Sequence, residues 1–482
     1  MAPRAAPPPR QLPAHDRRLS FLFIAAVCAS LSLLAACASV PDVDHLVDGA
    51  ASSTAKPVIM GSRGPLTQAQ SKALLARMVS EPGEAGMLQR HLAIEQAVAE
   101  NPLIAGNRTR LLRDGEESFR AVFAAIQGAK TYVNLEYYIL EDVESDGVML
   151  SDLLIAKRQA GVAVNIIYDS FGSSSTPVEF FDRLKQAGVN VVEFNPINPF
   201  DAKVDYSLNR RGHRKILTVD DTIGIVGGVN LSTTYQSIKL GKSGSGGDES
   251  TPEQPWRDTV LQIEGPAVAQ LQGLFFDHWD QQQGPPLARA ESTPAIPARG
   301  TEVIRIIGST PDHAVPRFYV TLLSAIRNAE KSITMTAAYF VPTDREKVDL
   351  MDAARRGVDV RLLLGAHSDS QWTVAAAHSH YSDLLKAGVK IYELQGSLLH
   401  SKTVTVDGVW SIIGSSNIDH RSIMFNDEVD AVVLGSETAQ AMERMFNDDL
   451  ADARRIDPAT WSDRPILQKV KEVLSRLWQE LL

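Results

Sequence analysis

Two short stretches of the sequence each place a histidine and a lysine where both can act on one phosphate group. Each stretch has the pattern His-x-Lys-x-x-x-x-Asp. Side chains two residues apart lie on the same face of a strand, so the imidazole and the ammonium group of each copy can address one phosphate together. The six residues are His213, Lys215 and Asp220 in the first copy, and His400, Lys402 and Asp407 in the second. We predict that all six take part in catalysis.

Each pattern is followed, at the same distance, by a glycine and an asparagine. The first copy continues to Gly227 and Asn230, and the second continues to Gly414 and Asn417. One such pattern alone carries little weight, because short motifs arise by chance. Two copies with the same extension are a specific signal, and the alternative, a pair of structural hairpins with buried histidines, is much less favoured. Asn230 and Asn417 are therefore predicted site residues.

In each half a carboxylate precedes a glycine by seven residues. Asp258 precedes Gly265 at this interval, and Glu428 precedes Gly435. A carboxylate that accepts a hydrogen bond from one imidazole nitrogen fixes the tautomer and leaves the other nitrogen free to attack. We predict that Asp258 and Glu428 orient the two histidines. The alternative is a buried ion pair or a cap at a strand end.

These residue types support nucleophilic attack on phosphorus. One histidine would form a covalent phosphohistidine, while the other would protonate the departing alcohol and later deprotonate the incoming one. We favour His213 as the nucleophile and His400 as the acid and base, although sequence symmetry does not settle the order. The lysines and asparagines would hold the non-bridging oxygens, so we expect no metal and no other cofactor. His378 and His380 are interpreted as a polar helix face, because no cysteine or tight carboxylate accompanies them.

The two patterns belong to an internal duplication, in which residues 131–268 correspond to residues 331–438. Both halves share the order strand, helix, strand, helix, strand ahead of the histidine, with first strands expected at residues 132–140 and 332–341. This order predicts an α/β fold of two similar lobes, each a mixed β-sheet flanked by helices, with the active site at the lobe interface. Ahead of the first strand, the apolar spacing of residues 107–126 predicts a helix.

The first 36 residues have the features of a bacterial lipoprotein signal peptide. Two arginines precede an apolar run at residues 19–34, and small residues follow up to Cys37. This ending resembles the lipobox, whose cysteine is lipidated and becomes the new N-terminus. An uncleaved anchor helix is the alternative, but about sixteen apolar residues fall short of the ~20 that a membrane span needs. We predict a periplasm-facing, lipid-anchored protein of the bacterial cell envelope. The outer membrane is favoured, because Ala38 stands where lipoproteins of the inner membrane usually carry aspartate.

Six segments are expected along the chain. They are the signal peptide (1–36), a flexible tether (37–66), an N-terminal helical segment (67–104), the first lobe (105–295), the second lobe (296–460) and a C-terminal amphipathic helix (461–482). A flexible insertion at residues 241–250 is expected to be a surface loop, with a lid as the alternative. The C-terminal helix gathers its apolar residues on one face, and packing against the domain is favoured over binding to a bilayer. These residues are Ile466, Leu467, Val470, Leu474, Leu477, Trp478 and Leu481.

The paired motifs are the signature of the phospholipase D superfamily, which residues 105–460 resemble. Within it the chain is most similar to bacterial cardiolipin synthases, through the stretches LNRR (208–211), WRDTVLQIEGP (256–266) and IDHRSIMFNDE (418–428). The resemblance implies a phosphatidyltransferase that forms cardiolipin from phosphatidylglycerol and a second phospholipid through a phosphohistidine. Gly228 departs from the common pattern, which has serine there. Only Ser415 is therefore expected to offer the phosphate a hydroxyl donor.

Charge and composition separate the functional alternatives. The chain has 48 Lys and Arg against 58 Asp and Glu, a net charge of -10. Because phosphate backbones need clustered positive charge, nucleic acid is not an expected partner. We expect a monomer that acts on phospholipids and is held at the membrane by lipidated Cys37. The alternatives are a phospholipase D or other phosphodiester hydrolase, less favourably a nuclease, and least favourably a silent lipoprotein that only binds lipid.

Overall fold

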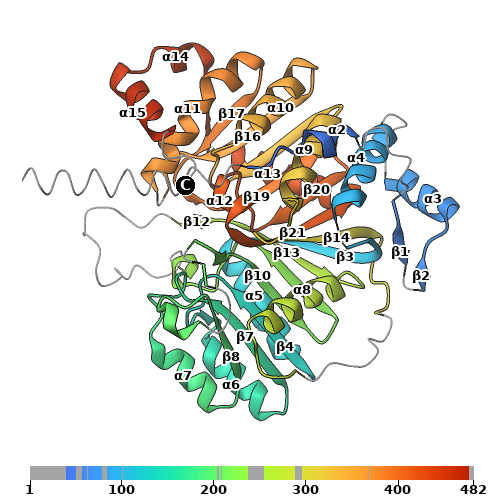
Figure 1. Ribbon diagram of the computed structural model, residues 1–482, viewed down its shortest axis with the longest axis vertical. Helices are drawn as coiled ribbons and strands as arrows, with labels where there is room; N and C mark the ends of the chain where they lie inside the picture. Colours follow the sequence, from blue (N-terminus) through green and yellow to red (C-terminus); the bar gives the residue numbers. More distant parts are fainter. Residues whose placement is uncertain are drawn as a thin grey trace, which may run out of the picture.

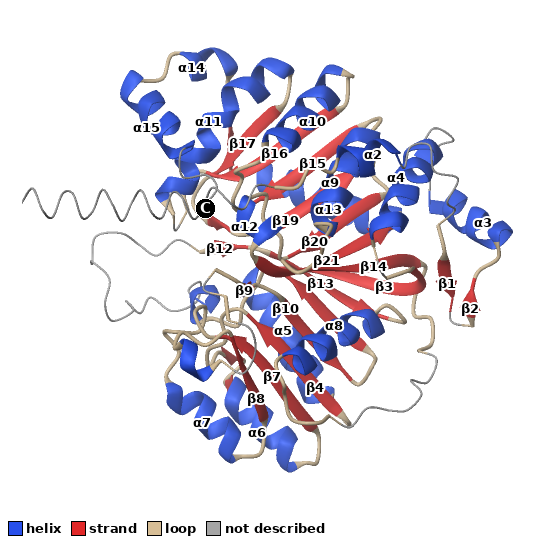
Figure 2. Ribbon diagram, in the orientation of Figure 1, coloured by secondary structure: helices blue, strands red, loops and turns tan. Residues whose placement is uncertain are grey.

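The computed structural model describes residues 40–49, 57–61, 63–78, 84–99, 101–202, 206–207, 209–236, 255–287, 296–368 and 370–476. Their helices and strands form two α/β lobes, one below and one above the centre of the molecule in Figure 1. Strands run through the middle of both lobes, and helices cover the outside (Figure 2). Two lobes with mixed sheets confirm the predicted fold class. Among the described residues, no helix is both long enough and apolar enough to cross a membrane.

The sheet of the first lobe has the strand order β8-β7-β4-β10-β11-β13-β3. The strands β8, β7 and β4 are parallel, and every later neighbour is antiparallel. The helices α5, α6 and α7 cover one face, and α8 covers the other. The strands are β3 (Leu103–Arg113), β4 (Tyr132–Tyr137), β7 (Ala163–Asp169), β8 (Asn190–Phe194), β10 (Lys215–Val219), β11 (Ile223–Gly227) and β13 (Thr259–Glu264). The helices are α5 (Asp114–Gly128), α6 (Leu150–Gln159), α7 (Val178–Gln186) and α8 (Val268–Gln281).

The second lobe repeats this order as β17-β16-β15-β19-β20-β21-β14, with the same strand directions. Its strands are β14 (Glu302–Ser309), β15 (Ser332–Ala337), β16 (Asp359–Gly365), β17 (Lys390–Leu394), β19 (Lys402–Val406), β20 (Trp410–Gly414) and β21 (Asn426–Leu434), with β22 (Ala453–Arg455) added beside β17. Its helices are α9 (Arg317–Asn328), α10 (Asp344–Arg355), α11 (Gln371–Ala387), α12 (His420–Met424) and α13 (Ser436–Leu450). Short elements elsewhere are β5 (Glu144–Ser145), β6 (Val148–Met149), η2 (Pro199–Asp201) and η3 (Thr233–Gln236).

The two sheets join through β3 and β14, which pair antiparallel across the lobe boundary. The prediction of a helix over residues 107–126 is therefore wrong in its first part, because residues 107–113 belong to β3 and α5 begins only at Asp114. Residues 108–113 of β3 pair with β13 and residues 104–107 pair with β14, and this ladder overrides the helical spacing of the side chains.

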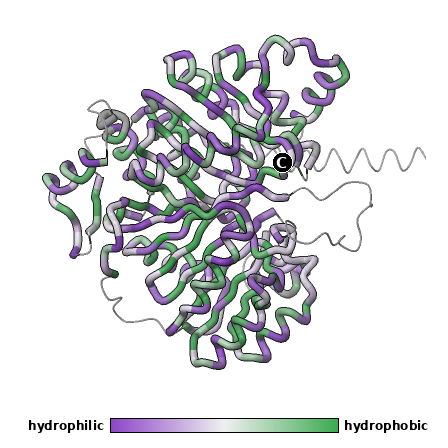
Figure 3. Tube along the Cα trace, turned by 180° about the vertical axis from the view of Figure 1, so that it is seen from behind, coloured by the Kyte–Doolittle hydropathy of each residue, from purple (hydrophilic) through white to green (hydrophobic). Residues whose placement is uncertain are grey.

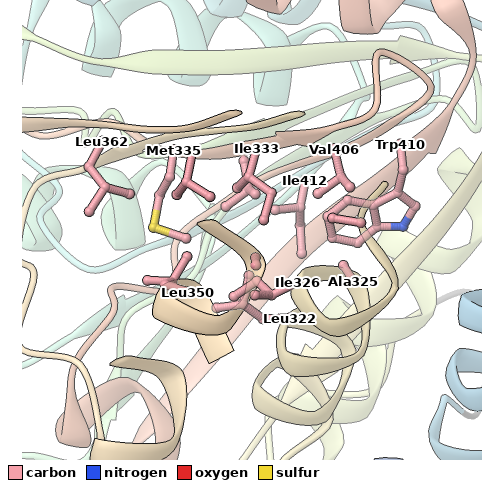
Figure 4. Close-up of a cluster of buried hydrophobic side chains, with 14 of the residues drawn as sticks. Leu322, Ala325, Ile326, Ile333, Met335, Leu350, Leu362, Val406, Trp410 and Ile412 are labelled. Carbon is pink, nitrogen blue, oxygen red and sulfur yellow. The ribbon is translucent and has the colours of Figure 1, made fainter. Parts of the chain in front are cut away.

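Both lobes are stabilised by apolar residues between the sheet and its helices. In the second lobe, Leu322 and Ile326 of α9 and Leu350 of α10 face Met335 and Trp410 of the sheet (Figure 4). Hydrophobic residues follow the interior strands of both lobes, whereas hydrophilic ones are frequent on the outer helices (Figure 3). The strands β14 and β21 are buried along their whole length, and both combine Val and Ile or Leu with buried charged residues.

The prediction of a flexible tether over residues 37–66 is wrong for the part of it that the structure describes. The helix α2 (Asp44–Gly49) packs on α9 through Val43 and Val47, which are 4% and 3% exposed. The strand β1 (Ile59–Gly61) pairs in parallel with β3 and antiparallel with β2 (Gly64–Pro65). Two or three apolar side chains anchor this segment, too few to stand out from its small and polar composition. The helices α3 (Gln68–Met78) and α4 (Glu84–Val98) follow.

The C-terminal helix also differs from its prediction. The helix α15 (Ile466–Arg476) follows α14 (Pro458–Ser462) and packs along α11, but Ile466 and Leu467 are 79% and 81% exposed. Its buried side carries Glu472, which forms an ion pair with Arg464 at 2.6 Å. The apolar face therefore does not pack against the domain, and the buried side of the helix carries Glu472 and Ser475 instead. Leu477, Trp478, Leu481, the signal peptide, Cys37 and the 241–250 insertion lie outside the described residues.

The aspartates of the two motifs hold the backbone instead of lining the site. The Asp220 carboxylate accepts the N–H groups of residues 130, 131 and 132 at 2.6–2.8 Å, and the Asp407 carboxylate accepts those of residues 330, 331 and 332 at 2.7–2.9 Å. Each follows its lysine by five residues, so it lies at the opposite end of β10 or β19, roughly 16 Å away. We therefore correct the prediction that Asp220 and Asp407 are catalytic.

Replacing Asp407 should weaken the fold and spare the chemistry. Asp407→Ala leaves three backbone donors without their carboxylate and puts alanine at a φ of 52°, so we expect the free energy of unfolding to fall by about 2–4 kcal/mol. Asp407→Asn keeps an oxygen acceptor and tolerates the left-handed backbone, so its loss should be less than half as large. Urea unfolding followed by circular dichroism measures both. Equal stability of Asp407→Ala and the wild type would contradict this role.

Candidate active site

Two pairs of short parallel strands cross between the lobes just ahead of the histidines. The strands are β9 (Arg211–Gly212), which pairs with the start of β21, and β12 (Trp256–Arg257), which pairs with β18 (Leu398–Leu399). Figure 2 shows β9 and β12 at the junction of the lobes. The register continues into the next residue, because the N–H of His213 donates to the Asp427 carbonyl at 2.9 Å and that of His400 donates to the Arg257 carbonyl at 2.8 Å. Each histidine is thereby fixed beside the acidic residue of the other lobe.

The predicted carboxylates contact the histidines, and the contacts cross the lobe boundary. Nδ1 of His213 lies 2.9 Å from Oε2 of Glu428, and Nδ1 of His400 lies 2.7 Å from Oδ2 of Asp258. Both carboxylates are fully buried. Burial alone would raise their pKa values, but the adjacent imidazoles and lysines hold both below their ordinary range. Each charged carboxylate accepts a hydrogen bond from the Nδ1–H group of its histidine. This leaves Nε2 of each ring available for chemistry. The sequence indicated the acids but not which histidine each one meets.

Hydroxyl groups hold the two carboxylates in place. The sequence did not indicate one of them, the hydroxyl of Tyr235. Ser415 donates to Glu428 at 2.5 Å, and Ser422 donates to the same group at 2.9 Å. Tyr235 occupies the position of Ser422 in the first copy, five residues after the asparagine, and its hydroxyl lies 3.2 Å from Asp258 and 2.9 Å from Nδ1 of His400. A hydroxyl residue at this equal interval is the signal that could have identified Tyr235.

Ser415 does not bind phosphate through its side chain in this arrangement. Its hydroxyl is fully buried behind Glu428, and Ser415 is absent from the described residues that line the cavity. Gly228, its counterpart, cannot carry a side chain, because a Cβ there would lie 2.1 Å from Oδ1 of Asp258. We therefore correct the phosphate-binding prediction for Ser415 to a role in positioning Glu428. The first copy therefore has no hydroxyl at position 228, and the hydroxyl group beside Asp258 is that of Tyr235.

The two lysines lie beneath the histidines and are almost fully buried. Nζ of Lys215 donates to the His213 carbonyl at 2.6 Å, and Nζ of Lys402 donates to the His400 carbonyl. Burial lowers the pKa of Lys215 to about 7, although the Glu428 carboxylate opposes the change, and repulsion from Lys402 adds to it. Two ammonium groups that repel each other in a dry site favour the binding of an anion near them.

The histidines are neutral in the empty site. Burial lowers the pKa of His213 to about 4, against the Glu428 carboxylate and with the help of both lysines. Burial and Lys402 lower the pKa of His400 as well, while Asp258 opposes them. A neutral imidazole has the free electron pair that a nucleophile needs. A bound phosphate would reverse the effect of the lysines, so the same pocket can protonate one ring when substrate enters.

A cavity of about 360 Å³ between the lobes contains part of the predicted site, because Lys215 and Lys402 are not among the described residues that line it. His213, His400, Asn230 and Asn417 line it together. The backbone N–H of Ile139 donates to Oδ1 of Asn230 at 3.2 Å, which leaves the amide N–H groups of Asn230 as donors. Further lining residues that the sequence did not indicate are Tyr138, Arg211, Thr234, Tyr235, Tyr339, Asp419 and Arg421. The volume suits the polar end of a lipid, since ligand sites span about 300–1,000 Å³.

The helix α11 carries the two histidines, His378 and His380, that could suggest a metal site. His378 lies on this helix with Nε2 2.9 Å from Glu393, and the nearby His380 is buried. Within the described ranges, no three His, Cys, Asp or Glu side chains are grouped as metal ligands.

Comparison with known proteins agrees with this geometry. Residues 122–240 and 322–450 match the family model described as cardiolipin synthase, PLD-like domain. A cardiolipin synthase of Geobacillus kaustophilus is 34% identical over 394 residues, which cover 81% of this chain and 76% of that protein. A probable cardiolipin synthase of Bacillus subtilis is 32% identical over 384 residues, covering 77% and 72%. The crystal structure of phosphatidylserine synthase from Haemophilus influenzae has the same fold, with a TM-score of 0.60 at 12% identity over 80% of this chain and 98% of that one.

The close approach of Gly228 to Asp258 can be tested by one methyl group. We expect Gly228→Ala to lower the free energy of unfolding by about 1–3 kcal/mol, because the carboxylate must move away from His400 to make room. Gly273→Ala is the matched control, since a Cβ at that position of α8 meets nothing within 4 Å, and it should be neutral or slightly stabilising. Urea unfolding compares the two. Two variants of equal stability would show that the contact is loose.

Proposed function

The chain belongs to the cardiolipin synthase family of phospholipase D-like phosphatidyltransferases, and from this premise we propose that it joins two phospholipids at the cavity between its lobes. The observation that carries the proposal is the convergence of His213 and His400 on one cavity, each with a buried carboxylate on Nδ1. Phosphatidylglycerol is the proposed donor of the phosphatidyl group, and the terminal glycerol hydroxyl of a second phosphatidylglycerol is the proposed acceptor.

In the proposed first step, Nε2 of His213 attacks the donor phosphorus and a P–N bond forms. The bond from phosphorus to the glycerol oxygen breaks, and the oxygen takes the proton of Nε2 of His400. In the second step, His400 removes the proton of the acceptor hydroxyl, whose oxygen bonds to phosphorus while the P–N bond breaks. Cardiolipin leaves, and both histidines regain their starting protonation. Lys215, Lys402 and the asparagines would hold the non-bridging oxygens throughout.

The surroundings of the histidines support this order of roles. Nδ1 of His400 has two oxygen neighbours, on Asp258 and Tyr235, which stabilise an imidazolium. Glu428 already accepts hydrogen bonds from Ser415, Ser422 and Asn426, so it is less able to favour a proton on His213. The ring that is easier to protonate suits the acid, and the other suits the nucleophile.

We also propose that lipidated Cys37 holds the protein at the membrane of the cell envelope on its periplasmic side. Val43 is already packed on the second lobe, so only five residues lie between the anchor and the folded body, a distance of six residue steps along the chain. Six residues span at most about 20 Å. A short connection of this kind would keep the cavity near its lipid substrates.

The product of the reaction tests the proposed transfer. Purified mature protein in vesicles that contain labelled phosphatidylglycerol should form labelled cardiolipin, resolved by mass spectrometry. Formation of phosphatidic acid alone would overturn transfer in favour of hydrolysis, because water would then be the acceptor. No turnover of lipid would contradict both.

Single histidine variants separate the two roles within this experiment. His213→Ala should form no cardiolipin and retain no label on protein after denaturation in alkaline detergent, a quench that preserves a P–N bond. His400→Ala should form no cardiolipin at neutral pH, but with a labelled phosphatidyl-p-nitrophenol donor, whose leaving group needs no proton, it should accumulate labelled phosphatidyl group on His213. Label retained by His213→Ala and not by His400→Ala would reverse the assignment.

The pKa values predict an acidic preference. Lys215 must carry its charge to bind phosphate, so kcat/KM should fall as pH rises through about 7, where its ammonium deprotonates in the free protein. His400 must be protonated, and its lowered pKa acts in the same direction. His213 becomes protonated only near pH 4, so the acid limb should lie below pH 5. Lys215→Arg, which stays charged, should lose the part of the decline between pH 7 and 8. A wild-type kcat/KM that rises up to pH 9 would refute this view.

A further inference from the structure

The catalytic centre is symmetric, but the walls of the cavity around it are not. The strand pairs β9 with β21 and β12 with β18 are equivalent by their register, since each precedes a histidine and an acid. In the first pair Arg211 lies opposite Asn426, and at the same positions of the second pair Leu398 lies opposite Trp256. The cavity is therefore lined by the cation Arg211 on the His213 side, whereas on the His400 side Trp256 lines it and Leu398 is not among the described lining residues.

A second difference adds another cation to the same side. Arg421 follows Asn417 by four residues, and the residue four after Asn230 is Thr234. Arg421 and Arg211 both line the cavity. Nη2 of Arg421 donates to the carbonyl of Asn209 at 3.2 Å, two residues before Arg211, so the two arginines come from opposite lobes to neighbouring positions. On the other side, the Trp256 ring lies 5.2 Å from that of His400.

These arginines are not needed for the reacting phosphate, which the symmetric lysines and asparagines can hold. A guanidinium group recognises a phosphate through parallel hydrogen bonds, and it is the side chain most suited to a second phosphate beside the first. Transfer between two phospholipids brings two phosphates into one cavity, and their mutual repulsion must be offset. Asp419 is the single carboxyl group among the described lining residues, and it accepts the Ser422 N–H at 2.8 Å as the cap of α12.

We propose that Arg211 and Arg421 form a subsite for the phosphate of the acceptor phospholipid, next to the symmetric subsite for the reacting phosphate. The inference rests on the proposed transfer function and deepens it. When the acceptor hydroxyl oxygen bonds to phosphorus, the P–N bond to His213 breaks and His400 takes the hydroxyl proton, while the acceptor's own phosphate stays bound and unreacted. The subsite thus selects an alcohol that carries an anionic phosphate over water or a simple alcohol.

An internal competition between two acceptors tests the subsite. Phosphatidylglycerol with a fluorescent acyl chain serves as a trace donor in vesicles of unlabelled phosphatidylglycerol, with ethanol in the water. The labelled products are cardiolipin and phosphatidylethanol, and their ratio does not depend on how much protein is folded. We expect Arg211→Gln and Arg421→Gln each to lower the ratio by about tenfold or more, and lysine at either position to restore part of it.

Matched charge changes away from the cavity are the control. Arg120→Gln on α5 and Arg355→Gln on α10 remove exposed cations, with side chains 53% and 56% accessible, and should leave the ratio within about twofold of the wild type. If the pocket variants lose both products in equal proportion, the arginines do not bind the acceptor and the proposal is overturned.

A separate readout applies if the wild type proves to be a hydrolase. In that case the proposed transfer fails, and glycerol 3-phosphate replaces the acceptor as a soluble probe. The subsite predicts that it inhibits hydrolysis by the wild type and that the double variant Arg211→Gln/Arg421→Gln is at least about tenfold less sensitive, while glycerol inhibits neither. Equal inhibition of both proteins would overturn the subsite.

Discussion

Everything at the site depends on the parallel pairing of two very short strands with strands of the opposite lobe. Ladder hydrogen bonds from His213 and His400 fix each ring beside the acid of the other lobe. The shared pair of β3 and β14 sets the relative position of the lobes, so the fold and the catalytic geometry rest on one interface. Buried carboxylates, lysines and imidazoles are costly to desolvate one by one. When they are buried together, their opposite charges offset this cost, and only the face toward the cavity is left open to an anion.

Several features were accessible from the sequence because they repeat. Equal intervals identified the His, Lys and Asn residues and the two acids, and the repeated element order indicated two α/β lobes. The pairing of acid and histidine was not accessible, because β9 and β12 are two residues long and carry no pattern of their own. Asp407 was predicted to be catalytic because it belongs to the repeated motif. Its odd spacing from Lys402 already places the two side chains on opposite faces of a strand.

Composition was the weaker guide. The segment around Val43 and Val47 reads as a linker, yet a few buried side chains fasten it to α9. The apolar stripe of α15 reads as a packing face, yet the ion pair of Arg464 and Glu472 takes the buried side. In both cases a small number of specific contacts outweighs the average character of the segment. Such contacts depend on partners that lie far away in the chain, which a local pattern does not contain.

The crossed arrangement of acids and histidines has a consequence for how such a molecule could arise. A chain with a single motif would hold a histidine and an acid that cannot meet each other, since each acid reaches only across the interface. Two identical copies related by a twofold axis would complete both pairs. A single chain that carries both copies is not bound to keep them identical. Arginines could then accumulate on one wall and aromatic rings on the other, which no symmetric dimer can encode.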